Sequence, residues 1–429
     1  MTLSSTYSFV HESSDSRVST RAINDDAFVV FTACSVNYLS KAVAMCLSVL
    51  DHEPNASIVV LLVDAKRDVQ LHDSRISILW AEDLNFPDYL KCAFKYNIIE
   101  FNTALKPFAA LHLLDSYEKV IYLDPDTCVF SPLTTVHTGL DVYAAVFTPH
   151  AMSPYNGDGR PSDRDLLRFG ACNLGFFAVR RSKSAQAMLH WWHERCHLDC
   201  FYEPQLGLGV DQKWIDLAFS FFDGLGILRD PGLNVAFWNL HERQISSTSD
   251  GWRVNNEALL GFVHFSSFVE FDEQAVADKQ TRYPVGSRPD FALAGRVYRS
   301  YLQRANALVA VADSGYRYGR FENGDAISPA LRRFYAISEN AVIKAAANPF
   351  VSNGPVHRFA QAHRLVSPEQ AATTHANFKI QANYSRQQKI ITSAFRLALR
   401  LLGPDRYFNL MRYLAHYSSL LNQVDLLRK

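Results

Sequence analysis

The stretch KVIYLDPD, residues 119–126, is an apolar run that ends in two aspartates, Asp124 and Asp126. Similar runs precede it in AFVVFTACSVNYL (from residue 27), SIVVLLVDA (57–65) and RISILWAED (75–83), and helical patterns separate them. Continuous apolar strands that alternate with helices are typical of a mostly parallel sheet covered on both faces. The sequence therefore predicts an α/β fold. Ligands of such sheets bind at the carboxyl ends of the strands, where the two aspartates lie.

The composition excludes several classes of protein. Lys+Arg and Asp+Glu both number 43, so no net charge favours nucleic acid as a partner. The seven cysteines have no disulfide-framework spacing and favour a reducing compartment. The polar N-terminus lacks the features of a signal peptide, and polar residues interrupt the apolar stretch 27–50. We expect a soluble, cytoplasmic protein that binds no nucleic acid.

The 429 residues are long enough for one large catalytic domain and an extension. We predict a flexible leader (1–24), a catalytic domain (25–287) and a helical C-terminal region (288–429). NLGFFAVRR (173–181) reads as a further strand, and LGFVHFSSF (260–268) as the strand that closes the sheet.

The last 44 residues, 386–429, are basic, with eight Lys and Arg against Asp405 and Asp425. In a helix, Lys389, Arg396 and Arg400 share one face, opposite Ile391, Phe395 and Leu402. Such a helix can lie on an anionic surface, here the inner face of the membrane. The alternative is a terminal helix docked on the protein with its basic side in solvent.

Asp124 and Asp126 are two residues apart, so in a strand their side chains point to the same side. Pro125 between them removes a backbone donor, which suits a strand that leaves its sheet. Two adjacent carboxylates repel each other unless a cation lies between them, and Mg²⁺ or Mn²⁺ would leave sites for phosphate oxygens. The alternative is an Asp-Pro-Asp turn with both acids solvated.

KVIYLDPDTCVFSPL resembles the D-x-D strand of GT-A glycosyltransferases, most closely the retaining, galactosyltransferase-like family 8. This family has a Rossmann-like, mostly parallel mixed sheet. Matches follow the family's order in FTACSVNYL, NTALKPFAALHLL, NLGFF, DQKW and HFSSF. The runs EFNTALKPF, DQKWIDL, NVAFWNL and RFENG are similar to those of bacterial surface-polysaccharide glycosyltransferases.

The resemblance implies a role for each matched residue. The base and ribose would be contacted by Ala33, Cys34 and Asn37. Other parts of the donor would be contacted by Lys106, Asp124, Asn173 and Gly175. The metal would be bound by Asp124, Asp126 and His264. Asp211 would hold sugar hydroxyls and Gln212 would lie near the anomeric carbon. The family follows its His-Phe pair with glycine and a Lys-Pro-Trp that contacts the diphosphate, whereas this chain has HFSSFVEFDE.

Each assignment has a simpler alternative. Lys106 could be a surface lysine, Asp211 a helix N-cap and His264 a core histidine. Asn173 and Gly175 could be a strand start with close backbone approach. HWWHERCHLDC (190–200) invites a zinc site, although zinc usually takes ligands in paired clusters and no second cluster lies nearby.

The resemblance implies a hexosyltransferase that uses Mn²⁺ or Mg²⁺. It would move a hexose, with retention, from a nucleotide-sugar such as a UDP-hexose to a saccharide or lipid-linked glycan of the bacterial surface. Two other functions stay open: a sugar nucleotidyltransferase and a catalytically silent glycan-binding or assembly protein. The first would need a Gly-rich basic loop after the first strand, which TACSVNYLSKA lacks.

Overall fold

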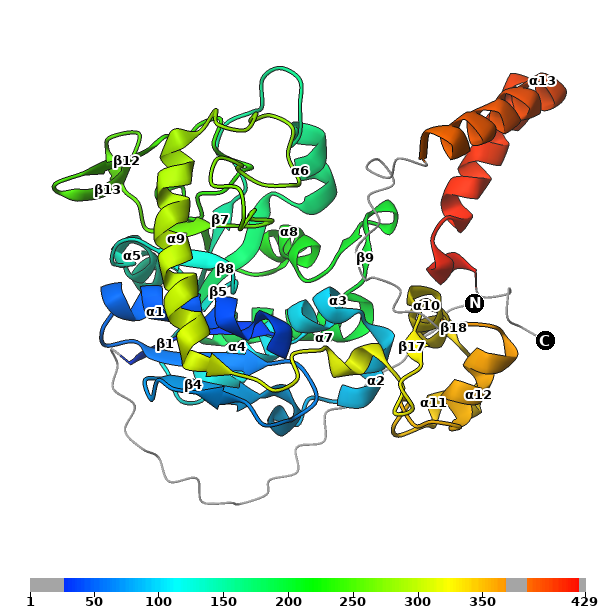
Figure 1. Cartoon of the computed structure of the whole chain (residues 1–429), viewed down its shortest axis with the longest axis horizontal. Coiled ribbons are helices and arrows are strands. Elements are labelled where there is room, and N and C mark those ends of the chain that lie inside the picture. Colours follow the sequence, from blue (N-terminus) through cyan, green and yellow to red (C-terminus); the bar gives the residue numbers. More distant parts are fainter. Residues whose placement is uncertain (1–26, 368–383, 424–429) are drawn as a thin grey trace.

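A computed structural model describes residues 27–367 and 384–423, so the predicted leader lies outside the described residues. Its centre is a seven-stranded sheet in the order β11-β7-β8-β5-β1-β2-β4 (Figure 1). The strands are β1 Phe28–Cys34, β2 Ser57–Leu62, β4 Ile76–Trp80, β5 Lys119–Leu123, β7 Ala145–Pro149, β8 Cys172–Arg180 and β11 Leu225–Ile227. Only β8 runs antiparallel to its neighbours in this sheet. The α/β prediction is confirmed.

Helices cover both faces of this sheet, and the central strands β1, β5 and β8 are therefore buried on both sides. In β1, Val29 and Phe31 belong to one hydrophobic cluster and Val30 and Cys34 to another. The first cluster includes residues of α2 Tyr89–Lys95, α3 Ile98–Ala104, α4 Lys106–Leu114, α7 Lys183–Asp199 and α8 Gln212–Phe221. The second includes residues of α1 Leu39–His52, α5 Thr134–Val142 and α9 Pro289–Leu308. Since α9 shares its core with α1, the domain division at residue 288 stays a prediction.

A two-stranded ribbon stands at the carboxyl end of β5. The chain turns at Asp124, whose carbonyl oxygen accepts from Thr127 N at 3.0 Å, and then enters β6 Thr127–Val129. β15 Phe262–His264 pairs with β6 in antiparallel fashion, with His264 opposite Thr127. The strand predicted within residues 260–268 to close the sheet region is therefore the short β15, and it lies outside the main sheet. The turn at Asp124 directs β6 away from the main sheet, and β15 pairs with β6 there.

The C-terminal region is helical, as predicted. It contains α10 Pro329–Ile337, α11 Ala341–Lys344 and α12 Pro355–Ala362, with β17 Ala326–Ile327 paired to β18 Val366–Ser367. The buried Arg332 of α10 donates to the carbonyl oxygens of Ala93, Phe94 and Tyr96, at 3.0, 2.8 and 2.7 Å. These hydrogen bonds attach the region to α2 and the residues that follow it.

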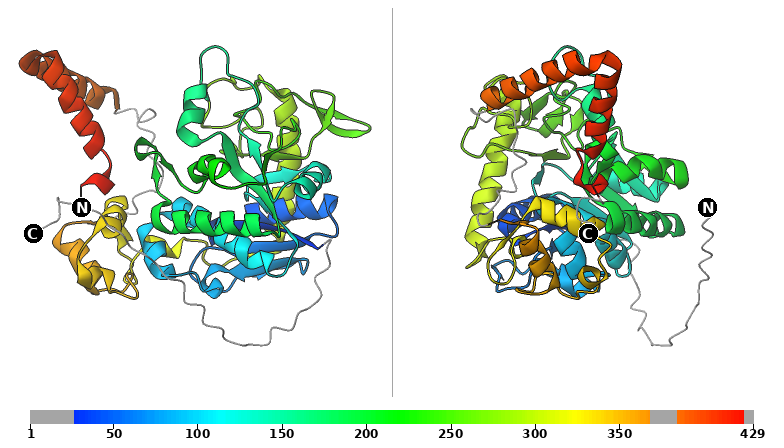
Figure 2. Two further views of the ribbon diagram at one scale, coloured as in Figure 1. Left: turned by 180° about the vertical axis from the view of Figure 1, so that it is seen from behind. Right: turned by 90° about the vertical axis from the view of Figure 1, so that its right-hand side faces the viewer.

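The last described segment is α13 Tyr384–Tyr417, followed by the short helix η5 Leu420–Asn422. Figure 2 shows α13 as a bent element that projects from the body of the molecule. None of the described helices combines the length and apolar character that crossing a membrane requires. The remaining elements are η1 Val36–Tyr38, β3 Gln70–Leu71, η2 Ala81–Leu84, α6 Asp163–Phe169, β9 Tyr202–Glu203, η3 Pro204–Leu206, β10 Leu208–Gly209, β12 Ile245–Thr248, β13 Gly251–Val254, β14 Ala258–Leu259, β16 Val309–Ala310 and η4 Arg317–Gly319.

Candidate active site

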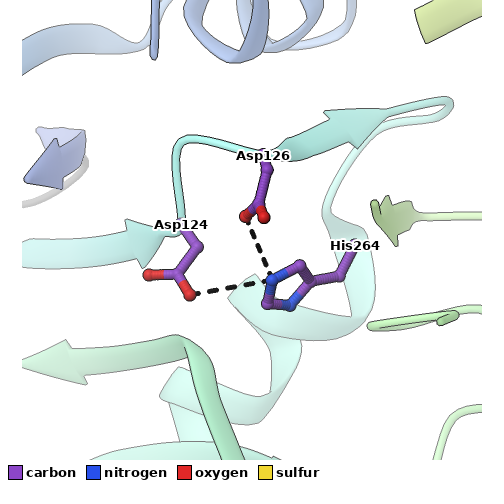
Figure 3. A group of neighbouring side chains, drawn as sticks. All are labelled: Asp124, Asp126 and His264. Carbon is purple, nitrogen blue, oxygen red and sulfur yellow. Dashed lines mark ion pairs between the residues drawn. The ribbon is translucent and has the colours of Figure 1, made fainter. Parts of the chain in front are cut away.

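Asp124, Asp126 and His264 converge where β5, β6 and β15 meet (Figure 3). The His264 Nε2 atom lies 3.1 Å from Asp126 Oδ1 and 3.7 Å from Asp124 Oδ2. One ligand atom from each residue lies within 4.8 Å of the others, and no other group of this kind occurs in the described ranges 27–367 and 384–423. The Asp-Pro-Asp turn does form, but it directs both carboxylates toward His264.

The charges of this group favour a cation. Burial alone would lower the pKa of His264, but Asp126 and Asp124 outweigh it and raise that pKa. Burial would likewise raise the pKa of Asp126, but His264 lowers it. Two carboxylates beside one imidazole keep a net negative charge even when the imidazole is protonated. Carboxylate and imidazole ligands with phosphate-accessible positions suit Mn²⁺ or Mg²⁺, so the residues fit the predicted metal.

Lys106 opens α4 and reaches the site from the side of the main sheet. Its Nζ atom lies 3.2 Å from Asp124 Oδ1 and 3.2 Å from Asp211 Oδ2, and it donates to the carbonyl oxygen of Leu174 at 3.1 Å. Only 4% of Lys106 is exposed, so the surface-lysine alternative is wrong. Burial would lower its pKa, but Asp124 and Asp211 raise it and keep the ammonium charged.

Asp211 and Gln212 lie at the start of α8. Asp211 occupies the N-cap position, but its side chain makes no capping hydrogen bond and instead pairs with Lys106. Burial raises the pKa of Asp211 to about 6. Gln212 accepts a hydrogen bond from Leu174 N at 3.0 Å and donates one to the carbonyl oxygen of Phe169 at 2.7 Å. Its amide therefore has a fixed orientation beside β8.

Gly175 makes room for His264. A Cβ atom built on Gly175 would lie 2.3 Å from His264 Cε1, closer than such contacts occur, so a side chain there would displace the ring. The neighbouring Asn173 side chain accepts from Gly175 N at 3.1 Å and from Asn234 Nδ2 at 3.0 Å. The close-approach alternative for Gly175 is thus correct, and its contact with a donor stays a prediction.

The predicted nucleotide loop follows β1, which pairs with β5. Ala33 and Cys34 are buried at the end of this strand, and Asn37 is exposed in η1. Burial raises the pKa of the Cys34 thiol above its ordinary range. The loop thus lies at the same sheet edge as Asp124, and its contacts with base and ribose stay predictions.

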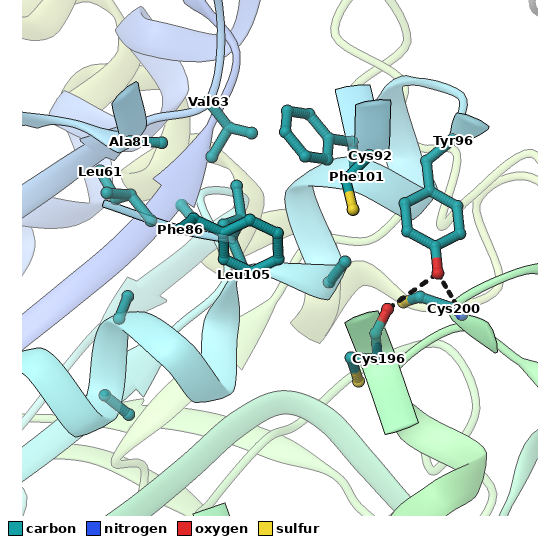
Figure 4. Close-up of a cluster of buried hydrophobic side chains, with 14 of the residues drawn as sticks. Leu61, Val63, Ala81, Phe86, Cys92, Tyr96, Phe101, Leu105, Cys196 and Cys200 are labelled. Carbon is teal, nitrogen blue, oxygen red and sulfur yellow. Dashed lines mark hydrogen bonds between the residues drawn. The ribbon is translucent and has the colours of Figure 1, made fainter. Parts of the chain in front are cut away.

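The histidines and cysteines of 190–200 do not form a metal group among the described residues. Cys196 and Cys200 lie in the hydrophobic cluster of Figure 4, beside Tyr96, whose hydroxyl donates to Cys196 O at 2.9 Å and accepts from Cys200 N at 3.0 Å. The His193 ring packs against Phe86, 5.3 Å between centroids. These residues serve packing.

Sequence reasoning missed several residues of the site. Tyr122 donates its hydroxyl hydrogen to Asp124 Oδ1 at 2.5 Å, and its place two residues before Asp124 in one strand was the available signal. Lys41 of α1 pairs with Glu270 at 3.0 Å and is close enough to Asp126 to lower the pKa of its carboxyl. Its role depends on a long-range contact that no local pattern indicates.

A buried polar group also borders His264. The Trp238 ring packs edge-on against both His264 and His150, with centroids 5.1 and 5.5 Å away. Burial lowers the pKa of His150 to about 4, so this imidazole is neutral at pH 7. His150 Nδ1, Trp238 Nε1 and Asn234 Oδ1 have no hydrogen-bond partner within the described structure. These are free donors and acceptors beside the metal group.

Comparisons with known proteins find two distant curated relatives and distantly similar solved structures. No family model matches it. Two curated Bacillus subtilis (strain 168) proteins, "Uncharacterized protein YfnD" and "Uncharacterized protein YfnF", are each 23% identical over 57% and 55% of this chain and 78% and 80% of their own lengths.

Three solved structures that match are glycosyltransferases. The galactosyltransferase LgtC, in complex with donor and acceptor sugar analogues, is 16% identical over 67% of this chain and 98% of its own, with a TM-score of 0.38. GlyE of Streptococcus pneumoniae TIGR4 is 14% identical over 70% of this chain and 67% of its own, with a TM-score of 0.35. Mouse xyloside xylosyltransferase 1 is 13% identical over 56% of this chain and 97% of its own, with a TM-score of 0.32. At these values the matches carry no argument about what this chain binds or transfers.

Proposed function

We propose that this protein is a metal-dependent glycosyltransferase that moves a hexose from a nucleotide-sugar, a UDP-hexose, to a saccharide or lipid-linked acceptor. One observation carries the proposal: the metal-binding group Asp124–Asp126–His264 adjoins the buried pair Lys106–Asp211 through Asp124. A cation site whose ligand Asp124 is held by a buried ion pair suits a diphosphate leaving group, which gains negative charge as the glycosidic bond breaks.

In this proposal Asp124, Asp126 and His264 hold Mn²⁺ or Mg²⁺. The bound ion supplies Lewis-acid stabilisation of the departing diphosphate. Lys106 keeps Asp124 in place by an ion pair at 3.2 Å, and Tyr122 does so by a hydrogen bond at 2.5 Å. Both contacts hold the ligand set in one orientation before the donor arrives, and such preorganisation lowers the cost of stabilising the transition state.

Lys41 takes the place of the lysine that the HFSSFVEFDE segment lacks. It lies in the first turn of α1, with 27% of its side chain exposed, and it faces both Asp126 and Glu270. The backbone N–H groups at a helix start also favour anions. A diphosphate that binds the metal group would compete with Glu270 for Lys41, and the Lys41 ammonium would then neutralise phosphate charge.

Retention is also part of the proposal. Asp211 is buried and paired with Lys106, and Gln212 is fixed by two backbone hydrogen bonds, so both are suited to position the sugar rather than to attack it. If the acceptor replaces the diphosphate on the same face of the sugar, within an ion pair, the protein needs no nucleophile. Asp211 and Gln212 then only have to hold the sugar ring. The unpaired Nε1–H of Trp238 and the unpaired Nδ1 of His150 would then form hydrogen bonds with sugar hydroxyls, the indole as a donor.

The test uses purified protein, a panel of nucleotide-sugars, and Mn²⁺ with or without chelator. We expect one donor to release a nucleoside diphosphate only when the metal is present, and Asp126→Asn to abolish the release. A glycan acceptor should accelerate the release, and the anomeric configuration of the product reports on retention. Formation of nucleotide-sugar from a nucleoside triphosphate and a sugar phosphate, with release of pyrophosphate, would instead indicate a nucleotidyltransferase. Failure of every donor to bind contradicts the proposal.

A further inference from the structure

Helix α13 exposes an unusual amount of apolar surface. Among the described helices it holds the most exposed large hydrophobic side chains, with Leu401 at 75% exposure. They are Ile390, Ile391, Phe395, Leu397, Leu399, Leu401, Leu402, Phe408, Tyr413, Leu414 and Tyr417. By contrast, α9 buries Phe291, Tyr298 and Leu302 against the sheet domain. Large exposed apolar patches mark interaction sites.

The apolar and basic residues of the first half of α13 lie on different sides. Helical spacing of three, four and seven residues places Ile391, Phe395 and Leu402 together, with Ile390, Leu397 and Leu401 beside them. Lys389, Arg396 and Arg400, all exposed, occupy the other side. The alternative in which this helix docks on the protein by its apolar face is wrong, because that face is exposed.

The far end of this segment is fixed to the protein. After α13, Ser419 is 1% exposed and Leu421 of η5 packs against the core cluster that includes Leu331 of α10. At the middle of α13, Gly403 has φ 73° and is followed by Pro404, so the helix breaks there into two halves. Figure 1 shows α13 as an elbow that extends beyond the sheet domain.

We propose that α13 lies flat on an anionic lipid bilayer, with its apolar side at the boundary of headgroups and acyl chains and its basic side chains on lipid phosphates. The apolar side chains would then contact acyl chains and the basic side chains lipid phosphates. Apolar burial and charge complementarity together drive interfacial binding. A second copy of α13 would cover the apolar side but leave the basic side without a partner. The broken helix fits a surface position, since neither half could span the bilayer.

Flotation of the full chain with vesicles tests this inference. We expect binding to vesicles of phosphatidylcholine and phosphatidylglycerol, weak binding to pure phosphatidylcholine, and release as sodium chloride is raised. Removal of one basic side chain lowers binding about five-fold, so the triple variant Lys389→Ser, Arg396→Ser, Arg400→Ser should bind on the order of a hundred-fold more weakly.

The apolar side is tested by Ile390→Asp, Leu397→Asp and Leu401→Asp together, which should abolish flotation. Val142→Asp is the matched control, because Val142 is an exposed apolar residue (70%) on α5, outside the patch. Circular dichroism verifies that each variant keeps its fold. Donor-dependent release of nucleoside diphosphate, measured in detergent-free solution, should stay unchanged, so this inference and the proposed function fail separately.

Three outcomes would overturn the inference. The first is a wild-type chain that does not float with anionic vesicles at low salt. The second is a chain that is dimeric in solution and becomes monomeric in the Ile390, Leu397, Leu401 variant, with flotation equal in wild type and variant; α13 would then be an interface between copies. The third is competition by inorganic phosphate at millimolar concentration, which would indicate an anion site instead of a lipid surface.

Discussion

Lys106 and Asp211 neutralise each other inside the protein, with Nζ and Oδ2 at 3.2 Å and only 4% and 2% of the two residues exposed. The same ammonium also pairs with Asp124, a predicted metal ligand. A buried charge that loses its partner is costly, whereas a complete pair is tolerated. The predicted sugar-positioning residue Asp211 and the predicted metal ligand Asp124 therefore depend on one lysine.

Lys106→Met should lower the free energy of unfolding by about 3–5 kcal/mol, because it leaves Asp211 buried without a countercharge. Adding Asp211→Leu to the same chain should recover part of that loss, since both charges are then absent. Urea denaturation of the two single variants and the double variant measures the coupling. Strict additivity of the two single effects would contradict the pair as described.

The pKa of Asp211 makes stability depend on pH. Its folded value of about 6 lies above its ordinary value of 3.8, so the folded state binds the proton more tightly. This contribution is fully present below about pH 4 and is lost as pH rises through 6. It amounts to about 3 kcal/mol. Asp211→Asn cannot titrate, so we expect the stability of wild type relative to this variant to fall between pH 4 and 7. A constant difference across that range would rule this out.

Asp126→Asn should weaken Mn²⁺ binding by at least about a hundred-fold, because a charged ligand becomes a neutral amide in a group of three. Isothermal titration calorimetry measures the affinity. Asp141→Asn is the control: this aspartate is exposed and pairs with Lys119 outside the site. Equal Mn²⁺ affinity in the two variants would exclude the metal group.

Gly175→Ala should disturb the same group without removing a ligand. The added methyl would meet the His264 ring at 2.3 Å, and overpacking of this kind costs about 1–3 kcal/mol. We expect weaker Mn²⁺ binding in a chain that still folds. Gly319→Ala provides the control, because Gly319 has ordinary φ and its nearest neighbour, Tyr316 Cδ1, would lie 3.8 Å away. Unchanged Mn²⁺ affinity in Gly175→Ala would mean that His264 is not a ligand.

Lys41→Ala should raise the KM for the nucleotide-sugar about ten-fold while leaving Mn²⁺ affinity close to wild type, since one charge contact to phosphate is lost. Lys183→Ala is matched to it, because Lys183 also stands in the first turn of a helix but is exposed on α7. Kinetics at saturating Mn²⁺ separate the two. If both variants behave alike, the phosphate role of Lys41 is wrong.

The sequence predicted the sheet and half of the site from local patterns. Apolar runs marked the strands and located Asp124 and Asp126 at a strand end, although a turn after β5, not strand spacing, directs both carboxylates to His264. The run 57–65 was too long, because Val63 and Asp64 already leave the sheet after β2. Local patterns extend over a few residues, so they locate strand interiors better than strand ends.

The approach of His264, Lys41 and Trp238 to the aspartates had no local signal. His264 arrives because β15 pairs with β6 instead of joining the main sheet, and that choice follows from the turn at Asp124. Lys41 arrives because α1 packs near the strand ends. The family resemblance predicted His264. It did not predict Lys41, because the family's phosphate-contacting lysine belongs to the Lys-Pro-Trp motif, which this chain lacks.

The pairing of β6 with β15 has a consequence for the order in which the protein is completed. All seven strands of the main sheet precede residue 228, but the third residue of the candidate metal group is contributed only when residues 262–264 join β6. A chain that ends before Phe262 would contain every strand of that sheet and only two of the three predicted ligands. Metal affinity during refolding or synthesis therefore reports closure of the ribbon, separately from formation of the sheet.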